Sequence, residues 1–286
     1  MMAAGKFKGP PPHVASLRQR IANVARRRNT TQERITVVVC NTVIGQMLPE
    51  GAVKGGTALK LRIGEAGSRF TPDIDSSRRV GLSLDDYRDA LEVNLRAGWN
   101  GFTGRLIKRR APAPLGVPEE YVMQPFDIKL EYRGRALKTL LLELGRDEVG
   151  STATRVVTIA DDIVELFDAL ELPRPAPVPV LATEHQIAQK LHACTTPNVH
   201  GSNDRAHDLV DLQLLVETDP PDLAVLNDVG IRLFTARRVG AWPPEVVAWP
   251  GWEALYAEAA RGLDVLTTVG DAVAWANELV TRAASA

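Results

Sequence analysis

Hydrophobic residues recur at helical spacing in several parts of the chain. Within 16–28 they recur every three or four positions among arginines, which predicts a basic amphipathic helix. The apolar residues of 31–47 also share one helical face, but many are β-branched, so helix and strand both remain possible there. Further helices are predicted over 84–95 and 161–170.

Segments with the character of strands alternate with these helices. Residues 51–54 are expected to form a strand that turns at Gly55 and Gly56. The run 57–62 after this turn is rich in helix-forming residues and predicts a helix. The chain is then expected to resume as a strand over 69–75.

A β-hairpin and a proline-rich segment follow. Apolar and polar residues alternate over 126–132, and a largely apolar run returns over 137–144. Four prolines within 171–180 indicate a linker, after which strand-like alternation nearly disappears. The expected parts are therefore a basic arm with a helix, an α+β domain, a linker and a mainly helical domain, with bounds 1–30, 31–172, 173–181 and 182–286.

The composition fits a globular protein of about two domains, with 286 residues, of which 45% are hydrophobic and 24% charged. It excludes disorder throughout the chain and fibrous repeats. The chain has no apolar run long enough to span a membrane and no apolar export segment at its start, so we expect a cytoplasmic protein without a membrane partner. Cys40 and Cys194 lack the spacing of a disulfide framework or zinc site and are expected to be buried.

Positive charge gathers in two stretches, although the formal net charge is only −1. Residues 1–28 contain seven lysines and arginines and no acid, and 105–110 contains four more. Clusters of this kind can be solvated surface, or they can bind the phosphates of a nucleic acid. We keep 18–28 and 105–110 as candidate phosphate contacts.

Two acids stand close together in the middle of the chain. Asp73 and Asp75 flank Ile74, and on a strand they would project to one side while Ile74 enters the core. Their mutual repulsion can be relieved by solvent, by protonation or by a divalent cation such as Mg²⁺. A second candidate is Glu143, a single carboxylate in an otherwise apolar strand, which needs compensation by a metal or an arginine, or pairs with Arg146.

The turn at Gly55 and Gly56 lies where a strand passes into a helix. Glycines allow close approach of the backbone, and the first N–H groups of a helix can bind an anion such as a triphosphate. Alternatively, the turn is only structural and Thr57 caps the helix. The sequence contains neither a P-loop nor the glycine pattern of a dinucleotide-binding fold.

These motifs together resemble the AbiEii/AbiGii nucleotidyltransferase toxins, a branch of the polymerase-β-like superfamily that includes the mycobacterial MenT toxins. Residues 54–62 and 69–75 are similar to the first motif of that family, and 182–191 and 205–212 are similar to its later motifs. The resemblance implies an α+β fold: a nucleotidyltransferase domain with a small mixed sheet, followed by a mainly helical domain, with the active site in the groove between them.

The resemblance also implies roles for individual residues. Asp73, Asp75 and Glu143, with Asp127 in reserve for the third position, would bind one or two Mg²⁺ ions. An NTP would be held by the glycine turn and by a lysine of a later motif, namely Gly55, Gly56, Thr57 and Lys190. The catalytic residues would be Asp73, Asp75, Lys190 and Asp211.

Helical spacing of i and i+3 puts Asp208 and Asp211 on one face, with Arg205 one turn earlier. Asp208 is therefore expected to pair with Arg205. The resemblance implies that Asp211 is the active-site acid and contacts Lys190 or the nucleotide. The nearby histidines have no acidic ligand in register and are interpreted as packing or solvent-facing residues rather than metal ligands; they are His185, His192 and His207.

The resemblance finally implies an acceptor and a partner. NMP would be transferred to the 3′ end of tRNA, which would block translation, and a cognate antitoxin would control the toxin. Two alternatives remain open: a nucleotidyltransferase that modifies a protein or small-molecule hydroxyl, and a nucleotide-binding module without turnover.

Overall fold

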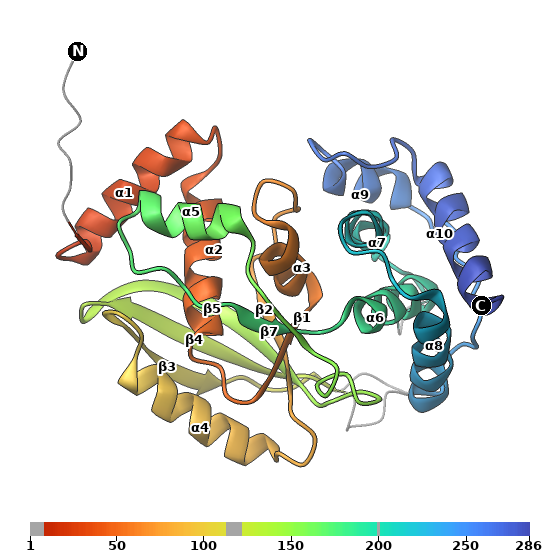
Figure 1. Ribbon diagram of the computed structural model, residues 1–286, viewed down its shortest axis with the longest axis horizontal. Helices are drawn as coiled ribbons and strands as arrows, with labels where there is room; N and C mark the ends of the chain where they lie inside the picture. Colours follow the sequence, from red (N-terminus) through yellow and green to blue (C-terminus); the bar gives the residue numbers. More distant parts are fainter. Residues whose placement is uncertain (1–8, 113–121, 199–200) are drawn as a thin grey trace.

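The computed structural model describes residues 9–112, 122–198 and 201–286. Its strands are β1 (Gly51–Lys54), β2 (Ile74–Arg78), β3 (Phe102–Lys108), β4 (Gln124–Tyr132), β5 (Arg135–Gly145), β6 (Val156–Thr158) and β7 (Val178–Val180). Its helices are α1 (Val14–Arg27), α2 (Gln32–Gly45), α3 (Gly55–Ile63), α4 (Leu84–Ala97), α5 (Asp161–Ala169), α6 (Thr183–Thr195), α7 (Ala206–Thr218), α8 (Leu223–Arg237), α9 (Trp252–Ala259) and α10 (Val269–Ala284). A sheet with its helices forms one half of the molecule, α6 to α10 form the other, and α3 lies between them (Figure 1).

The strands of the described residues form one mixed sheet in the order β3-β4-β5-β2-β1-β7-β6. β2 runs parallel to β5 and antiparallel to β1, while β1 runs parallel to β7. The α+β class, the mixed sheet and the helical second half agree with the expected fold. None of the helices in the described ranges is long and apolar enough to cross a membrane.

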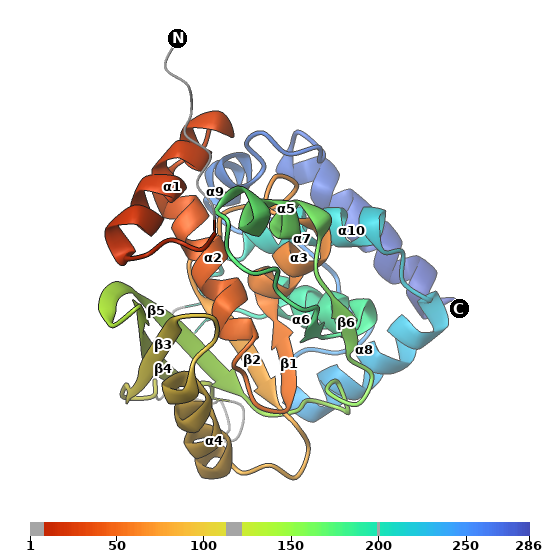
Figure 2. The same ribbon diagram turned by 60° about the vertical axis from the view of Figure 1, so that its left-hand side comes forward.

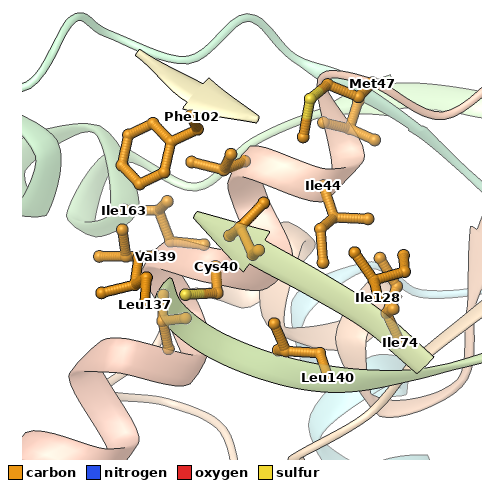
Figure 3. Close-up of a cluster of buried hydrophobic side chains, with 14 of the residues drawn as sticks. Val39, Cys40, Ile44, Met47, Ile74, Phe102, Ile128, Leu137, Leu140 and Ile163 are labelled. Atoms are coloured by element: carbon orange, nitrogen blue, oxygen red, sulfur yellow. The ribbon is translucent and has the colours of Figure 1, made fainter. Parts of the chain in front are cut away.

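The segment with the ambiguous pattern is a helix, α2, and it packs across the sheet. Thr31 caps it by accepting a hydrogen bond from the backbone N–H of Arg34. Val39, Cys40 and Ile44 of α2 meet apolar side chains from the strands, including Ile74 and Leu140 (Figure 3). Burial on the sheet therefore outweighs the low helix propensity of the β-branched residues.

The basic N-terminal helix is part of the core. Leu17, Ile21 and Val24 are buried, as the helical spacing predicted, and α1 packs against α2 and β5 (Figure 2). Arg20 is itself buried and donates a hydrogen bond to the backbone oxygen of Leu170. Packing rather than solvation thus decides the position of this helix.

The observed strands differ from the predicted ones in two places. The segment 69–75 was expected to be extended, but regular pairing begins only at Ile74 and the residues before it form a loop. Part of the proposed linker, Val178–Val180, is strand β7, and Val180 pairs with Val53 of β1. The hairpin is present as predicted, and Arg133 and Gly134 form its turn with φ angles of 49° and 71°.

The second half of the molecule has its own hydrophobic core, in which Trp252 and Tyr256 are among the buried side chains. Helix α3 connects the two cores. Leu59 packs into the helical core, whereas Ala58 and Leu61 pack into the core under the sheet. Because α3 begins at Gly55, the glycine turn lies where the two halves meet (Figure 2).

Candidate active site

Three carboxylates converge on one face of the sheet. Ligand oxygens of Asp73, Asp75 and Glu143 all lie within 4.8 Å of one another. Strand register explains this: Asp75 of β2 lies opposite Glu143 of β5, and Asp73 stands just before β2. Ile74 between the two aspartates is fully buried, so alternation along the strand sends both carboxylates to the other side.

The electrostatics of this acidic cluster favour a bound cation. Burial raises the pKa of Asp75 to about 7; among the neighbouring charges Lys54 and Arg205 lower it, whereas Asp73 and Glu143 raise it. Burial and the charge of Asp73 likewise raise the pKa of Glu143. Three carboxylate oxygens this close together fit a hard divalent ion such as Mg²⁺.

The reserve candidate Asp127 lies outside the cluster. It lies opposite Leu141 in the β4–β5 pair, whereas Glu143 lies opposite Pro125, two residues away on β4. Its Oδ1 lies 3.7 Å from Nη1 of Arg109. The structure therefore brings Glu143, and not Asp127, to Asp73 and Asp75.

The glycine turn presses closely against the acids. Gly55 has a φ of 63°, and a Cβ on it would collide with Oδ2 of Asp75. A Cβ on Gly56 would lie 2.5 Å from Oγ1 of Thr71, a buried hydroxyl with no hydrogen-bond partner among the described residues. The start of α3 has no side-chain cap, so its N–H groups are available to an anion beside the acidic cluster.

Thr57 lies in the first turn of α3 rather than at its cap, and its side chain is buried. Its hydroxyl donates a hydrogen bond of 2.7 Å to the backbone oxygen of Asp73, and it lies 3.3 Å from Nδ2 of Asn41. The side chain of Thr57 therefore fixes the loop that carries Asp73, which leaves only its backbone for a phosphate.

Lys190 and Asp211, both expected at the active site, belong to a buried ion network. Nζ of Lys190 lies 2.8 Å from Oδ1 of Asp208 and 2.6 Å from Oδ2 of Asp211. Arg69 binds both carboxylate oxygens of Asp211 at 2.8 and 2.9 Å. Arg205 pairs with Asp208 at 2.7 Å, as helical spacing had suggested.

This network joins the helical half to the loop before Asp73. Asp211 is fully buried; burial alone would raise its pKa, but the charges of Lys190 and Arg69 lower it. The Asp211 carboxylate is thus enclosed by two cations instead of facing the acidic cluster. Lys190 is 6% exposed and already holds two carboxylates.

The sequence did not predict that two cations, Lys54 and Arg205, lie near the acidic cluster. Lys54 lies opposite Asp75 in the β1–β2 register and is 8% exposed. Within the described ranges its Nζ has no hydrogen bond and no ion pair within 4.0 Å. Arg205 pairs with Asp208, yet its side chain remains 47% exposed, and its charge lowers the pKa of Asp75 and Glu143. The signal for Lys54 was its position at the end of a strand directly before the glycine turn.

The remaining polar residues support packing. Nε2 of His192 lies 3.1 Å from the backbone oxygen of Val239, and burial lowers its pKa to about 4. Arg18, from the first basic cluster, donates hydrogen bonds to the backbone oxygens of Ala136 and Leu137. Cys40 and Cys194 are free, buried thiols, as expected.

Solved structures provide a comparison for the fold. MenT4, a nucleotidyltransferase toxin from Mycobacterium tuberculosis H37Rv, is similar with a TM-score of 0.52 and 17% identity, over 94% of this chain and 98% of that chain. A polyadenylate synthase from Megavirus has a TM-score of 0.36 and 12% identity over 71% of this chain and 35% of that chain, which is too distant to support an inference. No curated protein matches the sequence.

A family model described as "Nucleotidyl transferase AbiEii toxin, Type IV TA system" matches residues 46–276. The match covers the glycine turn, the three acids and the ion network, and it extends over much more than half of the chain. The protein therefore belongs to the AbiEii family of nucleotidyltransferase toxins of type IV toxin–antitoxin systems.

Proposed function

We propose that this protein is a Mg²⁺-dependent enzyme that transfers a nucleoside monophosphate from an NTP to the 3′ end of tRNA. The observation that carries the proposal is the convergence of Asp73, Asp75 and Glu143 next to the start of α3. Carboxylates are suited to Mg²⁺, and free N–H groups at a helix start are suited to phosphate. Nucleotidyl transfer needs both beside each other.

In this proposal Asp73, Asp75 and Glu143 hold one or two Mg²⁺ ions. When bound, the metal neutralises phosphate charge and favours in-line displacement. The backbone of Gly55, Gly56 and Thr57 holds the terminal phosphates. The acceptor hydroxyl forms a bond to the α-phosphorus, the bond from that phosphorus to the bridging oxygen of the β-phosphate breaks, pyrophosphate leaves, and the hydroxyl proton passes to solvent.

Lys54 and Arg205 are the cations that we place against the triphosphate. Both act electrostatically on Asp75 and Glu143, and among the described residues Lys54 has no hydrogen-bonded or ion-paired partner. Lys190 and Asp211 have a positioning role in this proposal. Asp211 holds Arg69, and with it the loop that carries Asp73, while Lys190 holds Asp208, the partner of Arg205. Catalysis then depends mainly on positioning and on charge.

Transfer to the 3′ end would block the terminal hydroxyl of tRNA to which an amino acid is attached, and this would stop translation. The protein would act in the cytoplasm, where NTPs and tRNA are found, and a cognate antitoxin would be needed to protect the cell. The proposal places no part of the protein in a membrane.

The test is incubation with each labelled NTP in turn, with total tRNA and Mg²⁺. We expect label on tRNA and equimolar pyrophosphate with the unmodified protein. Asp75→Asn should lose both products, whereas Asp127→Asn, one step away on the same face, should retain them. Label on a protein or small molecule would reassign the acceptor, and nucleotide binding without pyrophosphate would make the protein a non-catalytic module.

A further inference from the structure

A large groove separates the two halves of the molecule on the side away from β3. Its volume is about 910 Å³. One wall comes from the α1–α2 turn, the start of α2 and the loop 65–70, and the other from the end of α9 and the residues after it. In Figures 1 and 2 these elements lie together at the same end of the molecule.

The walls of the groove are basic. Four arginines line it, and the two acids that line it are Glu65 and Glu258; the arginines are Arg28, Arg34, Arg69 and Arg261. Glu65 is already neutralised, because it pairs with Arg34 and with Lys60, whose Nζ lies 2.5 Å away. Arg69 is likewise paired, with Asp211, so the positive charge of the groove rests on Arg28 and Arg261, which stand on opposite walls and outnumber Glu258.

An aromatic ring stands in the same groove. Phe70 is 39% exposed, although burial of a phenylalanine side chain would stabilise the folded protein. Asp73 follows it three positions later in the chain, a stretch that spans at most about 11 Å. A base that stacks on Phe70 therefore lies close to the acidic cluster.

We propose that this groove binds the single-stranded end of the acceptor nucleic acid and directs its terminal hydroxyl to the acidic cluster. A basic groove combined with an exposed aromatic ring is the usual way in which proteins bind single strands without reading their sequence. Arg28 and Arg261 contact phosphates, and Phe70 stacks on a base. The inference rests on the proposed function, because it takes the acceptor to be a nucleic acid.

The experiment measures binding of a 12-nucleotide single-stranded RNA, labelled at its 5′ end with fluorescein, by anisotropy over a range of salt concentrations without NTP. We expect Phe70→Ala to weaken binding about tenfold, from the loss of one stacked base. The double variant Arg28→Glu/Arg261→Glu should lower the slope of log affinity against log salt by about 1.4, for two phosphate contacts.

The matched control is Arg135→Glu/Arg282→Glu, which reverses two exposed arginines outside the groove. It should bind the RNA like the unmodified protein. Thermal unfolding of each variant shows whether it has folded, and Phe70→Ala keeps the test valid if charge reversal disturbs α1.

Three results would overturn the inference: unchanged RNA affinity in both groove variants, equal losses in the control, or no RNA binding by the unmodified protein. This failure is distinguishable from failure of the proposed function. If the groove variants still transfer nucleotides to tRNA, the proposed function is retained and the role of the groove is rejected. If RNA binds in the groove but no nucleotide is transferred to tRNA, the groove is retained as an RNA-binding site and the proposed function is rejected.

Discussion

Lys54 and Asp75 lie directly opposite each other on β1 and β2, and Asp75 lies opposite Glu143 on β5. One row across three adjacent strands therefore carries a lysine followed by two carboxylates. Neighbours in such a row point to the same face of the sheet. The register thus places one cation beside two of the acids to which we assign the metal.

Lys54→Met tests the role of this lysine. It should weaken NTP binding by roughly tenfold or more, because a charge contact to a phosphate is lost. Stability should change little, since the ammonium has no ion pair within the described part of the protein. Isothermal titration with a non-hydrolysable NTP analogue and Mg²⁺ measures the affinity. Lys138→Met, which removes an ammonium paired with Glu33 outside the acidic cluster, is the control. Equal affinities in the two variants would remove Lys54 from the nucleotide site.

Gly55→Ala tests the contact between the turn and the acids. The new Cβ collides with Asp75, so the variant should lose the rise in melting temperature that Mg²⁺ gives the unmodified protein. Gly134→Ala is the matched control, because Gly134 also has a positive φ, of 71°, but open space around it. Both substitutions should cost about 1 kcal/mol of backbone strain. A normal Mg²⁺ response in Gly55→Ala would contradict the geometry.

The raised pKa of Asp75 predicts how stability depends on pH without metal. Burial raises this pKa from 3.8 to about 7, so the folded protein binds the proton more tightly than the unfolded chain. The free energy of unfolding should therefore fall as the pH rises from about 4 to about 7, by at most roughly 4 kcal/mol. Urea unfolding at pH 5 and pH 8 measures this fall. Mg²⁺ should reduce it, and a fall of the same size in Asp75→Asn would show that another group is responsible.

The buried network predicts that Lys190 acts mainly through structure. Lys190→Met leaves Asp211 and Asp208 without one of their cations and should cost about 3–5 kcal/mol of stability. Lys190→Met/Asp211→Asn removes an opposite charge as well and should recover part of that loss. Urea unfolding distinguishes the two. If Lys190→Met keeps full stability and only binds NTP more weakly, then Lys190 contacts the nucleotide directly.

Local spacing was sufficient for much of the site. Asp73 and Asp75 share a face because they flank one apolar residue, and the glycines at the start of α3 mark a turn because few other residues tolerate the positive φ of Gly55. The start of β2 was predicted too early, because the residues before Ile74 are held as a loop by contacts to distant groups, such as Arg34 with Glu65 and Arg69 with Asp211. No short window of sequence contains both partners of such contacts.

The sequence by itself determined the family, the amphipathic helices, the paired acids and the glycine turn, because each is encoded within a few neighbouring residues. Only the tertiary structure decided which distant side chains join them. Glu143 meets the aspartates and Asp127 does not, because the register of β5 against β2 fixes the pairing. Lys190 is enclosed because α6, α7 and the loop before Asp73 pack together and surround its ammonium with carboxylates, whereas Lys54 has no ion pair among the residues that the structure describes.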